Sequence, residues 1–89
     1  MMKKGYNKEK GVNIMKEYKV LLATINDVKK FVNTVSKYDF DVDLVSGRYA
    51  IDAKSIMGIF SLDLSKPIEL KVHTDNDADF YNEIKPFTV

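Results

Sequence analysis

The chain has 89 residues, with 14 Lys and Arg, 13 Asp and Glu and a formal net charge of +1. A chain of this length forms one small domain, which excludes a separate cofactor-binding domain, and the balanced charge gives no indication of a nucleic-acid partner. Because the sequence contains no cysteine, disulfides, thiolate metal sites and cysteine nucleophiles are excluded as well.

The beginning of the chain differs in composition from the rest. Four of the first ten residues are lysines, and the segment shows no apolar period of two or of 3.6 residues. This pattern predicts a flexible basic leader at 1–15, followed by a folded domain at 16–89. No apolar run approaches the roughly 20 residues that span a bilayer, and the leader lacks the apolar segment of a secretory signal. We therefore expect a cytoplasmic protein that does not bind a membrane.

The periodicity of the first half of the domain predicts three strands and a helix. Residues 17–23 alternate and predict a strand, whereas residues 24–38 repeat apolar side chains at i, i+3, i+4 and i+7, which predicts a helix. Residues 39–45 alternate strictly and predict a half-buried strand. After the turn "SGR", residues 49–53 can return as the partner strand of a hairpin.

The second half repeats this mixture of elements. A short helix is expected within 53–64, and Pro67 separates it from the alternating strand 68–74. The segment 75–87 predicts a last helix, with Asp75 or Asp77 as its cap and Pro86 near its end. The predicted order is β-α-β-β-α-β-α. An antiparallel four-stranded sheet covered on one face by helices, an open-faced β-sandwich of the α+β class, is the architecture that this order favours.

Two motifs resemble a known family. The stretch "AKSIMGIFSL" is close to the second-helix motif of HPr, the phosphocarrier protein of the bacterial phosphoenolpyruvate-dependent sugar phosphotransferase system. The stretch "VNTVSKY" resembles the end of that family's first helix. From about Glu17 to Ile84 the resemblance runs in the same order, and it implies the HPr-like fold. It also implies a carrier or regulator that is not an enzyme on its own and needs no cofactor.

The residues before the first helix depart from the family pattern. Counted back from "VSKY", Thr24 stands at the position of the phosphorylatable histidine, Asn26 at that of the arginine and Asp27 at that of a proline. A threonine phosphate is a stable ester, and an acid repels an incoming phosphate, so neither residue is a convincing replacement. Thr24 and Asp27 instead fit the [ST]-x-x-[DE] capping pattern, in which hydroxyl and carboxylate satisfy free backbone amides.

The remaining candidates for chemistry have simpler interpretations. His73, the only histidine, lies late in a strand on its polar face, which favours an exposed side chain over a substitute phosphoacceptor. The run "DNDAD" lacks the glycine and the final acid of a calcium loop. The aspartates of residues 39–43 lie on one strand face without a histidine or cysteine beside them, so no metal site is expected.

Ser55 is the residue on which a function can be based. In HPr proteins the matching serine is phosphorylated by an ATP-dependent HPr kinase, and the phosphoserine form binds a regulator of carbon catabolite repression. Lys54 adds a modest attraction for phosphate, and Ile56, Met57 and Phe60 resemble the apolar patch that docks partner proteins. The alternative is that Ser55 is only a helix cap and that the apolar residues belong to the core.

Three hypotheses follow from these observations. The preferred one is a regulatory, protein-binding HPr relative in which Ser55 is the switch, with HPr kinase, a catabolite-control regulator or phosphotransferase components as partners. The second is a phosphotransfer protein with a relocated acceptor at Thr24, Asp27 or His73. The third is an HPr fold reused as an assembly module. The sequence is compatible with a monomer or a weak dimer.

Overall fold

The computed structural model describes residues 15–89, so the leader predicted at 1–15 lies, apart from Met15, outside the described residues. The observed order of strands and helices is the predicted β-α-β-β-α-β-α, which confirms the fold class. The elements are β2 (Lys16–Val20), α1 (Ile25–Val35), β3 (Val42–Ser46), β4 (Tyr49–Asp52), α2 (Ile56–Phe60), β5 (Ile68–Val72), α3 (Ala78–Ile84) and the 3₁₀ turn η1 (Lys85–Phe87).

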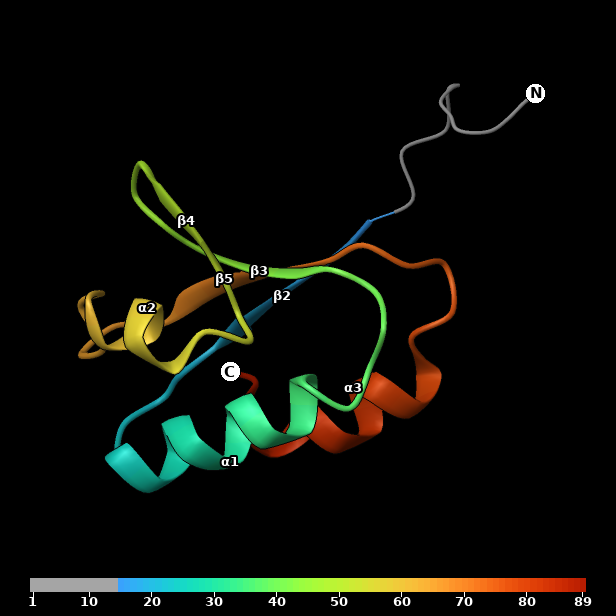
Figure 1. Ribbon diagram of the computed structural model, residues 1–89, viewed down its shortest axis with the longest axis horizontal. Helices are drawn as coiled ribbons and strands as arrows, with labels where there is room; N and C mark the ends of the chain where they lie inside the picture. Colours follow the sequence, from blue (N-terminus) through green and yellow to red (C-terminus); the bar gives the residue numbers. More distant parts are fainter. Residues whose placement is uncertain (1–14) are drawn as a thin grey trace.

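The four strands form one antiparallel sheet in the order β2-β5-β3-β4. Only β3 and β4 are joined by a tight turn, in which Gly47 adopts a φ of +61°, a conformation that glycine tolerates well. The central strand β5 comes late in the sequence and pairs with β2 on one side and β3 on the other. Figure 1 shows the sheet as one layer, with α1 and α3 side by side beneath it and α2 at one end.

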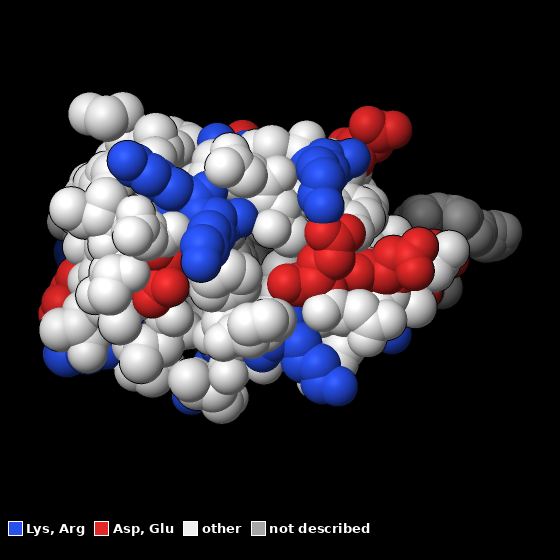
Figure 2. Space-filling view, turned by 90° about the horizontal axis from the view of Figure 1, so that it is seen from below, with Lys and Arg blue, Asp and Glu red and all other residues white. Residues whose placement is uncertain are grey.

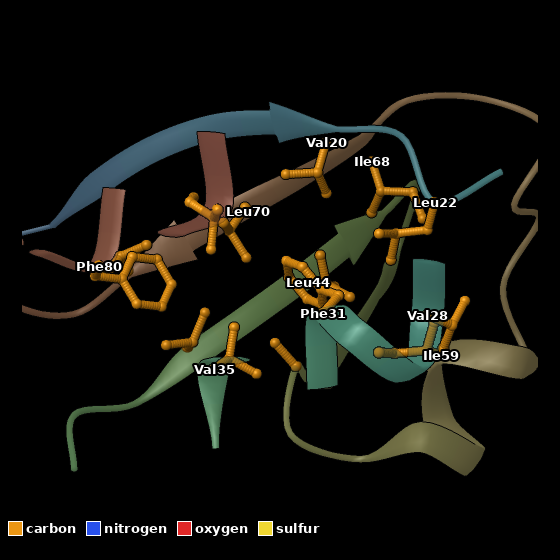
Figure 3. Packing of buried hydrophobic residues seen from close by; sticks show 14 residues of the cluster. Val20, Leu22, Val28, Phe31, Val35, Leu44, Ile59, Ile68, Leu70 and Phe80 are labelled. Carbon is orange, nitrogen blue, oxygen red and sulfur yellow. The ribbon is translucent and has the colours of Figure 1, made fainter. Parts of the chain in front are cut away.

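The core lies between the sheet and the helices, as the alternation in the sequence predicts. The strands β2, β3 and β5 turn alternate apolar side chains toward the helices, and α1 adds the face that repeats at helical spacing (Figure 3). The buried apolar residues are Val20, Leu22, Val28, Phe31, Val35, Val42, Leu44, Ala53, Ile59, Ile68, Leu70, Val72, Phe80 and Ile84.

The end of the chain covers the outer edge of β2. The amide of Leu21 donates to the carbonyl of Phe87 over 2.9 Å, and the amide of Val89 donates to the carbonyl of Lys19 over 3.0 Å. A bridge between Val20 and Thr88 lies between these two bonds. The carbonyl of Lys19 and the amide of Leu21, at the end of this edge, are therefore paired within the chain.

A polar cluster joins the end of α1 to α3. Both the Lys37 ammonium and the Tyr38 hydroxyl donate to the carboxylate of Glu83, and Figure 2 shows this helical face with basic and acidic side chains in contact. The two hydrogen bonds, from Lys37 and from Tyr38, hold the pKa of Glu83 below its usual value of 4.5. The hydrogen bond to Glu83 together with burial raises the pKa of Tyr38 to about 12.

The start of the last helix differs from the prediction. Asp77 occupies the N-cap position of α3, but its side chain makes no capping hydrogen bond. Its carboxylate instead accepts a hydrogen bond from the Tyr18 hydroxyl of β2. Burial and this bond raise the pKa of Tyr18 to about 12. The aspartate is therefore used for a contact between distant segments, which the local capping pattern does not reveal.

Across residues 15–89, none of the helices has the length and the apolar character needed to span a bilayer.

Candidate phosphorylation and docking site

Thr24 caps the first helix, as its capping pattern predicts. Its backbone is extended, and its hydroxyl accepts a hydrogen bond from the amide of Asp27 over 3.0 Å. The side chain of Thr24 is thus engaged in local structure at the point where α1 begins. A hydroxyl held in this way satisfies one of the free amides of the first turn.

The second half of the predicted capping pattern is absent. Among the described residues, the carboxylate of Asp27 accepts no hydrogen bond from the amide of Thr24. An aspartate side chain is one methylene shorter than glutamate, the acid that usually completes a capping box. The prediction that both side chains cap amides is therefore right for Thr24 and wrong for Asp27.

Ser55 caps the second helix in the same way. Its backbone is extended, and its hydroxyl accepts from the amide of Gly58 over 3.1 Å. The amide of Ser55 donates to the carbonyl of Asp52 over 3.0 Å, which fixes the turn from β4 into α2. Ser55 is exposed, so its hydroxyl combines a defined position with access from solvent.

Gly58 lies close against the cap. A Cβ atom built on Gly58 would lie 3.2 Å from the hydroxyl oxygen of Ser55 and 3.3 Å from the terminal methyl of Ile51. Both distances are shorter than ordinary van der Waals contact. The absence of a side chain at this position therefore lets the serine hydroxyl sit over the first turn of α2.

Lys54 is engaged elsewhere. Its ammonium donates to the carbonyl of Tyr38, just beyond the end of α1, over 2.7 Å. Its backbone amide donates to the carboxylate of Asp52 over 2.8 Å. In this conformation Lys54 connects the segment before α2 to the end of α1, whereas the sequence suggested an attraction toward a phosphate on Ser55.

The apolar residues of α2 divide into two groups. Ile59 is buried in the core and Ile56 is half-buried. Met57 is 76% exposed and Phe60 is 42% exposed. The core interpretation thus applies to Ile59, while Met57 and Phe60 present apolar surface to solvent.

A further exposed apolar side chain lies on α1. Ile25, the first residue of α1, is 62% exposed, and α1 packs against α2. The sequence analysis did not single out Ile25. The sequence gives no signal for its exposure, because Ile25 stands three residues before Val28, at the same spacing as the residues of the buried face. We refer to Ile25, Met57 and Phe60 as the exposed apolar surface.

His73 lies on the sheet face that the helices leave open, as the alternation predicts. Its Nε2 atom is 2.9 Å from a carboxylate oxygen of Asp43, and both side chains are about 40% exposed. Figure 1 shows α1 on the opposite side of the sheet. The described part of the chain contains no group of three or more His, Asp or Glu residues that could hold a metal ion.

The comparisons with known proteins agree with this geometry. Residues 26–85 match the family model described as "PTS HPr component phosphorylation site". That match covers well over half of the chain. The chain belongs to the HPr family. Proteins of this family are phosphocarriers of the phosphotransferase system that work with other proteins of that system and are not catalysts in themselves.

Two solved HPr structures are similar to the chain. The HPr-C-His structure from Thermoanaerobacter tengcongensis is 25% identical with a TM-score of 0.60, and the match covers 80% of this chain and 82% of the other. The HPr of Bacillus anthracis str. Ames has a TM-score of 0.61 at 23% identity, with coverage of 82% and 89%. Both likenesses agree with the HPr fold. The range matched by the family model includes Ser55 and begins two residues after Thr24.

Proposed function

We propose that this chain is a regulatory, protein-binding member of the HPr family, with Ser55 as its phosphorylated residue and no histidine carrier. The observation that carries the proposal is the exposed hydroxyl of Ser55 at the N-cap of α2, within the range that matches the family model. Thr24 stands at the position that the resemblance assigns to the carrier histidine, and a threonine phosphate is a stable ester that does not pass its phosphate on as a phosphohistidine does. In this proposal the chain keeps the serine and lacks a histidine at the carrier position.

A phosphate on Ser55 is compatible with the fold of α2. The hydroxyl oxygen already accepts from the amide of Gly58, and phosphate oxygens are stronger acceptors for the amides of a first turn. The exposed apolar surface supports the docking half of the proposal, because Met57 and Phe60 lie on the helix that begins at Ser55. Methionine adapts to the shape of a partner surface, and clustered exposed apolar residues are typical of interaction sites.

The partners that the family resemblance suggests are an HPr kinase, a catabolite-control regulator and components of the phosphotransferase system. The kinase would modify Ser55, and Ile56, Met57 and Phe60 would contribute contacts. Lys54 contributes to partner binding only if it leaves the carbonyl of Tyr38, where it lies over 2.7 Å. In this proposal the protein acts in the cytoplasm, and it acts only through contacts with other proteins.

The decisive experiment is incubation of the full chain with HPr kinase and ATP, followed by mass spectrometry. We expect one phosphoryl group on Ser55 and none in the Ser55→Ala variant. Ser61→Ala is the matched control, because Ser61 is an exposed serine at the other end of α2 and its loss leaves the modification unchanged. Absence of phosphate on Ser55, together with no binding to any phosphotransferase protein, would rule out the proposal.

A second incubation, with phosphoenolpyruvate and enzyme I, tests the carrier function. We expect no acid-labile phosphate and no hydroxylamine-sensitive phosphate, because the only histidine lies on the open sheet face and is paired with Asp43. Such a phosphate on His73 or Asp27, or a stable one on Thr24, would replace the regulatory proposal with a carrier that uses a relocated acceptor.

A further inference from the structure

A hollow of about 840 Å³ lies at the end of the sheet where β3 turns into β4. It is formed by residues 45–49 at the tip of the β3–β4 hairpin, by the connection from Ser61 to Pro67, and by one residue each of β2 and β5. In Figure 1 the hairpin tip and α2 lie at the same end of the molecule. The volume falls within the roughly 300–1,000 Å³ that small-molecule sites occupy. Ser55 is not among its lining residues.

Charged side chains of both signs line the hollow. Lys19 of β2 lies directly opposite Glu69 of β5 in the strand register, and both line the hollow. Cross-strand neighbours of opposite charge offset one another. The Lys19–Glu69 side of the hollow is therefore close to neutral, yet offers both donors and acceptors for hydrogen bonds.

A second pair of opposite charges lies on the connection after α2. The pKa of Asp63 is lowered, chiefly by hydrogen bonds from the hydroxyl and amide of Ser65 and also by the charge of Lys66. Both Asp63 and Lys66 line the hollow. This side also presents carboxylate oxygens beside an ammonium group.

Three cations line the hollow with only two carboxylates, and Arg48 is the cation left over when Lys19 is matched with Glu69 and Lys66 with Asp63. It is exposed at the hairpin tip beside Gly47, and among residues 15–89 it takes part in no ion pair. A guanidinium binds phosphate through two parallel hydrogen bonds, which makes arginine the preferred residue for such anions. The hollow therefore has one place suited to a phosphate group.

Tyr49 supplies an aromatic surface next to Arg48. It is 67% exposed and lines the hollow, although a tyrosine usually buries most of its ring. An exposed ring of this kind can contact the C–H face of a sugar, while the carboxylates of Asp63 and Glu69 accept hydrogen bonds from sugar hydroxyls.

We propose that the hollow binds a phosphorylated sugar, with its phosphate on Arg48 and its ring against Tyr49. Inorganic phosphate satisfies Arg48 alone and leaves the ring and the carboxylates without a partner. A neutral sugar leaves the guanidinium unpaired. A sugar phosphate uses all of these groups together. The proposal does not depend on phosphorylation of Ser55, which lies outside the hollow.

The test is an NMR titration of the full chain with glucose 6-phosphate, with glucose and with inorganic phosphate. We expect glucose 6-phosphate to shift the amides of residues 46–49 and 61–67, and to bind about tenfold more tightly than either other probe. Arg48→Gln is expected to weaken that binding about tenfold, the effect of losing one charge-assisted contact. Lys30→Gln removes a charge from α1 outside the hollow and is the matched control.

Each outcome of the titration is informative. Thermal unfolding of Arg48→Gln first confirms that the exposed substitution leaves the fold intact. No amide shift with glucose 6-phosphate, or binding that Arg48→Gln leaves unchanged, would overturn the proposal. Equal affinity for inorganic phosphate would overturn it as well, because the sugar would then contribute nothing. Loss of the preference for glucose 6-phosphate over inorganic phosphate in Tyr49→Thr supports the role of the ring.

Discussion

Two residues at the start of α2 act together: Ser55 caps the helix, and Gly58 leaves room for the capping hydroxyl. The hydroxyl of Ser55 accepts from the amide of Gly58, and a Cβ atom at residue 58 would lie 3.2 Å from the same hydroxyl. Glycine within a helix costs about 1 kcal/mol relative to alanine, and loss of a serine cap costs about the same. The two effects are therefore coupled through one oxygen atom.

This coupling predicts a specific result for Gly58→Ala. In the wild-type chain we expect the free energy of unfolding to change by less than about 0.5 kcal/mol, because the gain in helix propensity is offset by displacement of the cap. In a Ser55→Ala background the same substitution is expected to stabilise by up to about 1 kcal/mol, since no cap remains to be displaced and only the terminal methyl of Ile51 must give way. Urea denaturation of the four proteins measures both values.

The control for this cycle uses the other capped helix. Thr24→Ala removes the hydroxyl that caps α1, and Gly58→Ala in that background is expected to behave as it does in the wild-type chain. The coupling is refuted when Gly58→Ala has the same effect whether or not Ser55 is present.

At the scale of elements, one carboxylate accepts the polar contacts between the end of α1 and α3. Glu83 accepts hydrogen bonds from Lys37 and Tyr38, and these lower its pKa below 4.5. A carboxyl group whose pKa is lower in the folded state stabilises the fold above its unfolded pKa. That stabilisation is lost as the pH falls below 4.5 and through the lowered pKa of Glu83.

Glu83→Gln therefore changes the pH dependence of stability. We expect the substitution to reduce the free energy of unfolding at pH 7 and to make its decline below about pH 4.5 shallower than in the wild-type chain. The measurement is urea denaturation at a series of pH values. Glu17→Gln, which removes an exposed carboxylate from β2, is the control. Identical pH profiles for Glu83→Gln and the wild-type chain would contradict this role.

The elements differ in how far the sequence predicts them. Strict alternation in β3 and β5 and the helical spacing of α1 each show which face is buried, so the strands, the helix and the core are predictable. The caps at Thr24 and Ser55 are predictable too, because an N-cap is a local pattern. Asp77 follows the same local pattern but binds Tyr18, and only the folded arrangement brings those two residues together.

The candidate site shows the same limit. The motif "AKSIMG" indicates Ser55, yet Lys54 binds the carbonyl of Tyr38, sixteen residues earlier in the chain. Exposure of Ile25 and Tyr49 depends on how α1 and the hairpin are placed. Contacts between distant segments decide both features, and no local period reports them.

For the whole molecule, stability rests on one core without disulfides. Leu44 is fully buried where β3 faces the helices (Figure 3). A domain of this size has about 5–15 kcal/mol of stability in total, and removal of a buried leucine side chain costs about 2–5 kcal/mol. A single core position therefore accounts for a large part of the total.

Leu44→Ala is expected to lower the free energy of unfolding by about 2–5 kcal/mol, measured by urea denaturation. Val45→Ala is the matched control, because Val45 is the next residue of β3, is only half-buried and points to the open face. We expect about 1 kcal/mol for that change. Equal losses at the two positions would show that the open face contributes as much packing as the helical face.

The paired edge of β2 sets a limit on how the sheet can grow. The described sheet has β4 at one end and, at the other, β2 with residues 87–89 alongside it. A strand edge with free backbone groups is a template for addition of another chain, and here β4 is the end of the sheet without a neighbour. When two copies pair through β4, the backbone groups of this edge become hydrogen-bonded in both molecules. Beyond two copies, strand addition to the described sheet is left with only the part of the β2 edge before Lys19, which residues 87–89 do not cover.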